Sequence, residues 1–270
     1  MKRVTSHLLT KDRDSLILGR GNDVGQYVNT NAINKLQSVA WSLNENIFHL
    51  IHDELKPSEE PLSAVEEAER VRAFKLRDKE TSAIMNYLLD NDNRFFFGWK
   101  YDSRGRSYSQ GYHINPQGNE YRKAMLSFAD KEMLTEEGKT YLLIDIANCY
   151  GYDKEIWFKR IVEAKKMVKD IFADGRSTDR KIKEYMQDAD SPMLFAKAIY
   201  AWKEGVIEGK PIGHNMGLDG TASGLQFMSA MSGCVTTAQN SNVHAKIHRE
   251  YTEEAQARLE ELEAELASLN

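Results

Sequence analysis

An acidic residue followed by a run of small residues is the most chemically suggestive feature of this 270-residue sequence. In GLDGTASGLQ, Asp219 ends an apolar-leaning run, and the residues at 220–223 are all small. Mg²⁺ takes oxygen ligands, usually one or two carboxylates together with substrate phosphates. The Asp219 carboxylate and the Gly220 carbonyl, which no side chain blocks, are therefore candidate Mg²⁺ ligands. An Asx-turn or a helix N-cap before residues 222–232 explains the aspartate equally well, so both interpretations stay open.

Arginine, glycine and aromatic residues come together in YDSRGRSY, residues 101–108. Arginine grips phosphate through a planar fork, and glycine lets backbone approach a ligand closely. Aromatic rings such as that of Tyr108 can stack on bases. Arg104, Arg106 and Tyr108 are therefore candidate nucleic-acid contacts. The competing interpretation is a surface turn whose arginines pair with Asp102 and other carboxylates.

Two further patterns carry weaker chemical signals. In ANCYGYDKEIW, residues 147–157, Lys154 could bind phosphate as a point charge. The alternative is a helix start that Asp153 caps and at which the lysine is solvated. His244 and His248 have the i, i+4 spacing of metal ligands on a helix. Their surroundings are polar and no HExxH pattern is present, so we interpret them as a solvated helix face.

The composition is that of a globular protein, with 41% hydrophobic and 29% charged residues. No apolar run reaches the roughly 20 residues that span a bilayer, and two cysteines give no disulfide framework, so we expect a cytoplasmic protein without membrane contact. Net charge is -5, but residues 94–131 hold seven Lys/Arg against three Asp/Glu. Residues 241–270 hold three against seven glutamates. A basic centre with an acidic tail predicts local binding of a polyanion.

Helical periodicity predicts a mostly helical α+β fold with four regions. Residues 1–27 are predicted to form an irregular arm, and residues 28–93 two helices, over 28–55 and 62–89, that form an antiparallel hairpin. The crowded aromatic residues and glycines at 95–130 predict strands and turns within a third region, 94–240. The other expected elements are helices at 136–149, 155–172, 192–207 and 222–232, a short strand at 211–218, and a helical tail over 241–270. The apolar stripe of that tail either docks a partner or packs on this chain.

The ordered set of motifs resembles one family, the single-subunit DNA-dependent RNA polymerases of phages and mitochondria. DSRGR at 102–106 resembles the family's DxxGR element, and NPQGN at 115–119 resembles a stretch that follows it. Residues 136–154 resemble the palm helix with its ANC-x-G-x-DK ending, and DSP at 190–192 also fits. LDGTASGLQ at 218–226 resembles motif A, whose aspartate binds the catalytic metals.

The resemblance implies a partial polymerase palm at 94–240 and a thumb-like hairpin at 28–93. It implies that Asp219 binds both Mg²⁺ ions with help from the Gly220 carbonyl, and that Lys154 touches the triphosphate of the incoming nucleotide. Arg106, supported by Arg104 and Tyr108, would contact the template strand or the hybrid. One departure is that Phe227, and not the family's common histidine, follows the glutamine of motif A.

Two-metal nucleotidyl transfer needs carboxylates on both sides of the metal pair. Nothing after residue 231 resembles the family's second aspartate or its fingers helix. Within the family, the chain is therefore most similar to the smaller subunit of the heterodimeric RNA polymerase of some bacteriophages. This implies an enzyme subunit that is inactive without a second subunit carrying the fingers and the second aspartate. Its other partners would be DNA template, nascent RNA and nucleoside triphosphates. The alternative is a non-catalytic nucleic-acid-binding or scaffold protein derived from a polymerase.

Overall fold

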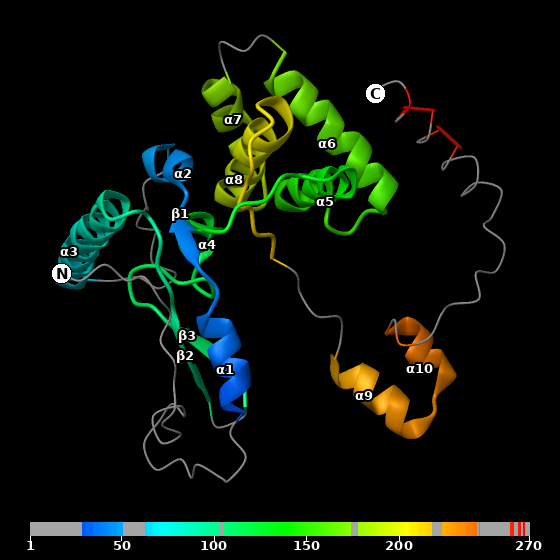
Figure 1. The fold of residues 1–270 in the computed structure, drawn as a ribbon, viewed down its shortest axis with the longest axis horizontal. Coiled ribbons are helices and arrows are strands. Elements are labelled where there is room, and N and C mark those ends of the chain that lie inside the picture. The colour runs from blue at the N-terminus through cyan, green and yellow to red at the C-terminus, as the bar shows by residue number, and fades with distance from the viewer. Residues whose placement is uncertain are drawn as a thin grey trace.

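The computed structural model describes residues 29–50, 63–102, 105–173, 178–217, 223–241, 243, 260–261, 264–265 and 267. In this part of the chain helices predominate and the sheets are small, which confirms the predicted mostly helical α+β class. Helices α5 to α8 gather in one group, while the long helix α3 and the hairpin β2–β3 lie away from them (Figure 1). Among the described residues, no helix is both long and apolar enough to cross a membrane.

A strand interrupts the first predicted helix, so the prediction of a continuous helix over 28–55 is wrong. Helix α1 (Thr30–Gln37) is followed by β1 (Trp41–Leu43) and then by α2 (Glu45–Leu50). The backbone of Trp41 exchanges hydrogen bonds of 2.8 and 2.9 Å with Phe95, and β1 pairs antiparallel with β4 (Leu126–Phe128). Phe95 and β4 are far from β1 in the sequence. Helical periodicity takes no account of such distant partners, so it assigns the buried residues of β1 to a helix.

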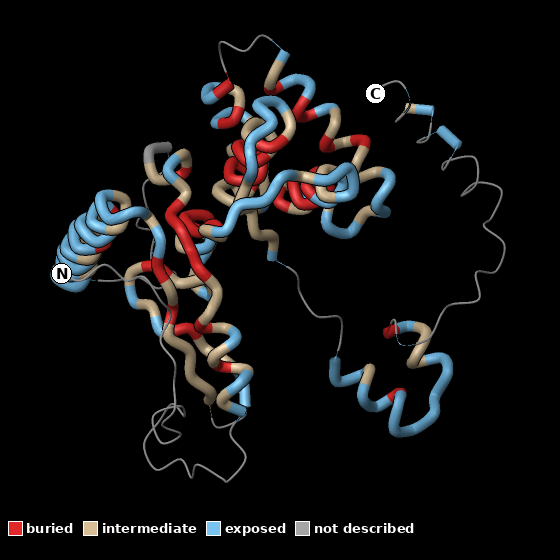
Figure 2. The backbone as a smooth tube through the Cα atoms, viewed as in Figure 1, coloured by how far each residue is buried: buried red, intermediate tan, exposed pale blue. Residues whose placement is uncertain are grey.

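Helix α3 (Ala64–Asp90) confirms the second helix expected in the N-terminal half. It begins with a capping box, in which Ser63 and Glu66 each satisfy a backbone N–H of the other. Of its residues only Thr81 and Met85 are buried, and Figure 2 shows most of the helix as exposed. The turn expected between the two arms of the hairpin lies outside the described residues, so the thumb-like hairpin remains a prediction.

The aromatic region forms strands and turns as the sequence predicts. Strands β2 (Gly98–Tyr101) and β3 (Ser107–Gln110) make an antiparallel hairpin, and the short helix α4 (Glu120–Ala124) leads into β4. The DSRGR stretch falls at the tip of this hairpin. The chain then returns through α4 and β4 toward the helices of the core.

The main core forms where α5 (Glu136–Ala147), α6 (Trp157–Ile171) and α8 (Pro192–Trp202) pack together with α4. Seven of the eleven residues of α8 are buried, among them a lysine, and Figure 2 shows this concentration of buried residues. The expected helices at 136–149, 155–172 and 192–207 are confirmed, with π-helical ends at Asn148–Tyr152 and Lys203–Ile207.

The remaining helices are α7 (Thr178–Met186), α9 (Ser223–Ser232) and α10 (Val235–Asn240). The sequence predicts α9 but neither α7 nor α10, which are short. Most of the acidic tail lies outside the described residues, and so do His244 and His248. One contact of the tail is described: Glu265 makes an ion pair of 2.5 Å with Lys166 on α6. That contact supports packing of the tail on this chain.

Candidate active site

Backbone bonds hold the segment that precedes Asp219. Residues 212–215, here called the strap, begin with Ile212, which exchanges backbone hydrogen bonds of 2.9 and 3.0 Å with Glu132. The carbonyl of Gly213 accepts a bond of 2.7 Å from the N–H of Phe128. The approach at Gly213 is so close that a Cβ there would lie 1.9 Å from the carbonyl oxygen of Phe128. The short strand predicted at 211–218 is thus reduced to a single β-bridge.

A buried histidine–aspartate pair holds the next residue of the strap. Nε2 of His214 lies 2.7 Å from Oδ2 of Asp145, and both side chains are only 9% exposed. Asp145 comes from α5, where it interrupts the apolar run LLIDIA. The thiol of Cys149 lies 4.0 Å from the other carboxylate oxygen. Burial, followed by the charge of Asp145, raises the pKa of Cys149 well above its usual value, so this thiol stays protonated.

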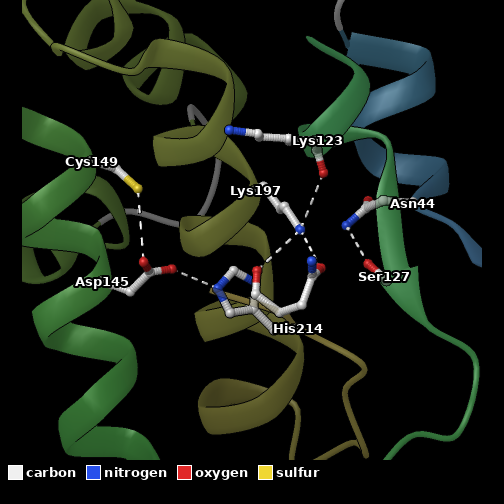
Figure 3. Close-up of polar contacts among 8 residues, drawn as sticks. Asn44, Lys123, Ser127, Asp145, Cys149, Lys197 and His214 are labelled. Atoms are coloured by element: carbon white, nitrogen blue, oxygen red, sulfur yellow. Dashed lines mark hydrogen bonds and ion pairs between the residues drawn. The ribbon is translucent and has the colours of Figure 1, made fainter. Parts of the chain in front are cut away.

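A buried lysine on α8 holds the last residue of the strap. Lys197 is 1% exposed, and its ammonium group donates to the side-chain oxygen of Asn215 at 2.6 Å and to its carbonyl at 3.3 Å. A third, longer bond of 3.5 Å reaches the carbonyl of Lys123 on α4. Burial lowers the pKa of Lys197 to about 8, although the charge of Asp145 acts in the opposite direction. Figure 3 shows this lysine between α4 and the strap.

Four side chains therefore form one polar cluster in the core, here called the polar clamp: Asp145, Lys197, His214 and Asn215. Buried charges are costly unless they are paired or hydrogen-bonded. Lys197 donates to neutral oxygen atoms of Asn215 and Lys123, and the Asp145 carboxylate is bonded to His214. The sequence analysis missed all four residues. The available signal was a single charged residue inside an otherwise apolar helix, in LLIDIA and again in PMLFAKAIYAW.

A polar cavity of about 540 Å³ borders the strap. This volume lies in the range of sites for small molecules. Its lining carries both signs of charge and so does not by itself select one class of ligand. Among the lining residues are Asn44, Asn93, Arg94, Lys131, Glu204 and His214.

At the tip of the β2–β3 hairpin, residues 102, 105 and 106 are described. The carboxylate of Asp102 accepts a bond of 2.8 Å from the backbone N–H of Arg106, and Gly105 adopts φ +79°. This bond fixes the backbone at Arg106, and pairing of Asp102 with the arginine side chains stays open as an interpretation. The Arg106 side chain is exposed, and within the described residues its guanidinium makes no ion pair. Tyr108 lies half-buried on β3, and Arg104 lies outside the described residues.

The NPQGN stretch braces this hairpin through its side chains. The side-chain oxygen of Gln117 accepts from the backbone of Ser109 at 2.8 Å, and its amide group donates to the carbonyl of Ser107 at 2.9 Å. Asn115 accepts a bond of 2.5 Å from the Ser109 hydroxyl. These bonds fix β3, and with it the direction in which the arginine turn projects.

Helix α4 connects the hairpin to the polar clamp. The carboxylate of Glu120, in the first turn of α4, accepts bonds from the backbone N–H groups of Met193 and Leu194 at 2.6 and 3.3 Å. A carboxylate is favourable there because the N-terminus of α8 carries unsatisfied N–H groups and positive potential. The other end of α4 supplies the carbonyl of Lys123 to Lys197. The arginine turn and the strap are thus attached to the same helix.

The ANCYGYDK and DSP motifs pack against each other. The N–H of Ser191 donates to the carbonyl of Cys149 at 2.9 Å, and Asp190 donates to Tyr150 at 3.2 Å. Gly151 has φ +129°, and a Cβ there would lie 2.9 Å from the carboxylate of Asp190. Glycine is therefore required at this position by its backbone angle and by the space available.

Lys154 follows this junction and is exposed, with no hydrogen bond or ion pair to the described part of the chain. One interpretation of the sequence makes Asp153 the cap of the following helix, but the structure does not show this cap. The N-cap of α6 is Ile156, which makes no side-chain capping bond. Lys154 is therefore available to an external anion.

The predicted metal ligands Asp219 and Gly220 lie outside the described residues and remain predictions. The described residues contain no group of three or more His, Cys, Asp or Glu side chains that could hold a metal ion. What the structure does describe is the segment that leads to Asp219, held residue by residue from 212 to 215.

Comparisons with known proteins show which proteins this chain is similar to. Residues 132–263 match the sequence model of the family described as DNA-dependent RNA polymerase. The chain is 27% identical to the DNA-directed RNA polymerase of Enterobacteria phage T3; the match covers 74% of this chain and 26% of that protein. Identity to the polymerase of Pseudomonas phage phiKMV is 26%, over 85% of this chain and 33% of that one. Identity to the mitochondrial DNA-directed RNA polymerase of Schizosaccharomyces pombe is 23%, and this match covers 84% of this chain and 23% of that protein. The chain thus spans about a quarter to a third of the length of these relatives.

Proposed function

This chain is related in sequence to the DNA-dependent RNA polymerases of phages and mitochondria, and from that premise we propose that it supplies part of the palm of such an enzyme. In this proposal it contributes one metal-binding aspartate, Asp219, to template-directed RNA synthesis. The observation that carries the proposal is the match of residues 132–263 to the polymerase family, because this segment contains both Lys154 and Asp219.

The donor set at the proposed centre fits Mg²⁺ by its chemistry, since a carboxylate and a backbone carbonyl are hard oxygen ligands. Asp219 would hold the metal with the Gly220 carbonyl. When bound, Mg²⁺ lowers the pKa of the RNA 3′-hydroxyl that attacks the α-phosphate and neutralises the pyrophosphate leaving group.

The other predicted residues would bind the nucleic acid and the nucleotide. Lys154 is exposed and would contact the triphosphate as a point charge. Arg106, held at the tip of a braced turn, would contact phosphates of the template or the hybrid, with Arg104 and Tyr108 beside it. Positioning of these groups matters more than their number, because small displacements in an active site cost large factors in rate.

We further propose that the second carboxylate and the fingers come from a second polypeptide, which makes the working enzyme a heterodimer. The proposal is supported by the chemical need for carboxylates on both sides of a metal pair. DNA template, nascent RNA and nucleoside triphosphates would be the other partners. A scaffold function without catalysis has no observation of its own in the described residues that favours it.

The test is to isolate this chain with the polypeptides that accompany it in its native cell and to measure primer extension on a DNA template. We expect extension by the assembly and none by the purified chain alone. Asp219→Asn should abolish extension in the assembly while template binding stays within about twofold. Lys154→Ala should raise the KM for nucleotide more than it weakens template binding.

Different results would refute different parts of the proposal. RNA synthesis by the single purified chain would rule out the two-chain assembly. Wild-type extension rates in Asp219→Asn would rule out its metal role. An unchanged nucleotide KM in Lys154→Ala would remove that residue from the nucleotide site.

A further inference from the structure

We propose that Lys197 and Asp145 are positioning residues for Asp219, acting through Asn215 and His214 without touching the substrate. The inference rests on the proposed function and adds to it a buried device that sets where the metal-binding carboxylate sits. Asp145 lies within residues 136–154, which resemble the palm helix of the family, but that resemblance assigns it no role, and Lys197 lies outside the resembling motifs.

Only a short stretch of chain separates the polar clamp from Asp219. Asp219 is the fourth residue after Asn215, and an extended chain spans at most about 3.6 Å per residue. The α-carbon of Asp219 can therefore lie at most about 14 Å from that of Asn215. A shift or loosening of the strap would therefore change the positions that the proposed metal ligand can reach.

The chemistry of Lys197 suits this task. An ammonium group has three donors and no acceptor, and here all three point to oxygen atoms: two of Asn215 and one of Lys123. The lysine thus fixes both the side chain and the backbone of one strap residue. Because Lys123 lies on α4, the same ammonium also ties the strap to the helix that carries the arginine hairpin.

Asp145 fixes the neighbouring residue from another direction. Its carboxylate bonds Nε2 of His214 at 2.7 Å from helix α5, whereas Lys197 reaches Asn215 from α8. Two consecutive strap residues are therefore held by two helices of the core. Since a hydrogen bond with a charged partner is directional and short, it defines a position more narrowly than apolar packing does.

The experiment compares Lys197→Met with Lys169→Met, an exposed lysine on α6 that serves as the matched control. The first readout is hydrogen exchange of the backbone amides at 212–217 in the full chain. The second is the Mg²⁺ concentration for half-maximal extension by the assembled enzyme, measured beside the Kd for template. We expect faster exchange at 212–217 in Lys197→Met and a roughly tenfold higher Mg²⁺ requirement, with template Kd unchanged within about twofold. Lys169→Met should match wild type in all three.

Asn215→Ala provides a second variant, because it removes the side-chain acceptor and leaves the buried lysine in place. It should raise the Mg²⁺ requirement in the same direction. An unchanged Mg²⁺ requirement in both variants would overturn the inference, even if exchange at 212–217 increased, because the clamp would then be structural only. A wild-type assembly that makes no RNA would overturn the proposed function together with the inference. Wild-type synthesis with unaltered variants would overturn the inference alone.

Discussion

The close packing at Gly213 allows the role of the strap to be tested without changing any charged group. Replacement by alanine adds one Cβ, which would lie 1.9 Å from the carbonyl oxygen of Phe128 and 2.9 Å from its carbonyl carbon. Ordinary van der Waals contact begins near 3.4 Å, so the two backbones must separate by about 1.5 Å at this point. Both contacting atoms belong to backbone, and no rotamer change can relieve the overlap.

The cost of this separation follows from the bonds it breaks. The Phe128 N–H to Gly213 carbonyl bond is 2.7 Å long and cannot survive such a movement. Leaving a backbone donor without its partner costs about 1–3 kcal/mol, and overpacking adds about 1–3 kcal/mol. We therefore expect Gly213→Ala to lower the free energy of unfolding by about 2–6 kcal/mol. A protein of this size then loses roughly 5–15 °C in Tm.

The matched control is Gly217→Ala, on the same segment. A Cβ at Gly217 meets nothing within 4 Å, so its effect on stability should stay within about 0.5 kcal/mol. The assay is denaturant unfolding of the full chain, followed by circular dichroism. If Gly213→Ala were as stable as Gly217→Ala, the strap would not be held against β4 as described, and the reasoning on the position of Asp219 would lose its basis.

Three further predictions concern Lys197, Gly151 and the acidic tail. The pKa of Lys197 is lowered to about 8 from 10.5, so between these pH values the unfolded state binds more protons, and stability should rise with pH. From pH 7 to 10.5 the free energy of unfolding of wild type should rise by about 3 kcal/mol relative to that of Lys197→Met. If the free energies of unfolding of the two proteins changed in parallel with pH, the prediction would be contradicted. Gly151→Ala should lower the free energy of unfolding by about 2–4 kcal/mol, measured by thermal unfolding. Adding Asp190→Ala should restore only part of this loss, because the positive φ remains, and full recovery would exclude backbone strain. Lys166→Glu should change the free energy of unfolding by less than about 1 kcal/mol and make the tail more sensitive to protease. Adding Glu265→Lys should reverse both effects, and a lack of reversal would show that the ion pair does not hold the tail.

The sequence predicts the long helices well because each buries its own periodic face. Helices α5, α6 and α8 carry apolar residues at helical spacing, and their partners are one another. Strand β1 could not be predicted in this way. Its three residues lie within a helical pattern, and the bonds that make them a strand come from Phe95 and from β4, about 50 and 85 residues later.

The candidate site divides in the same manner. The motif residues at 102–106 and 115–119 can be recognised in the sequence, and the structure adds that the second stretch acts as a brace for the first. The polar clamp could not be assembled from the sequence, because Asp145, Lys197 and His214 belong to three separate elements. Only the placement of Asp145 and Lys197 within apolar helices pointed to the cluster, and nothing in the sequence around His214 did. A charged residue alone inside a buried helix therefore predicts a hidden partner, though not which one.

The energetics of the clamp favour a role in positioning over a role in stability. A pKa lowered by burial means that the charged form of Lys197 is less stable in the fold than in water, so at neutral pH this ammonium lowers the stability of the chain. Apolar side chains of similar volume often stabilise a core more than a buried ion pair does. A stability optimum would therefore place a methionine at this position of α8, a helix that has six other buried residues. Because the lysine costs stability and yet fixes both the backbone and the side chain of Asn215, its benefit must lie in the geometry of the segment that it holds, which leads within four residues to Asp219.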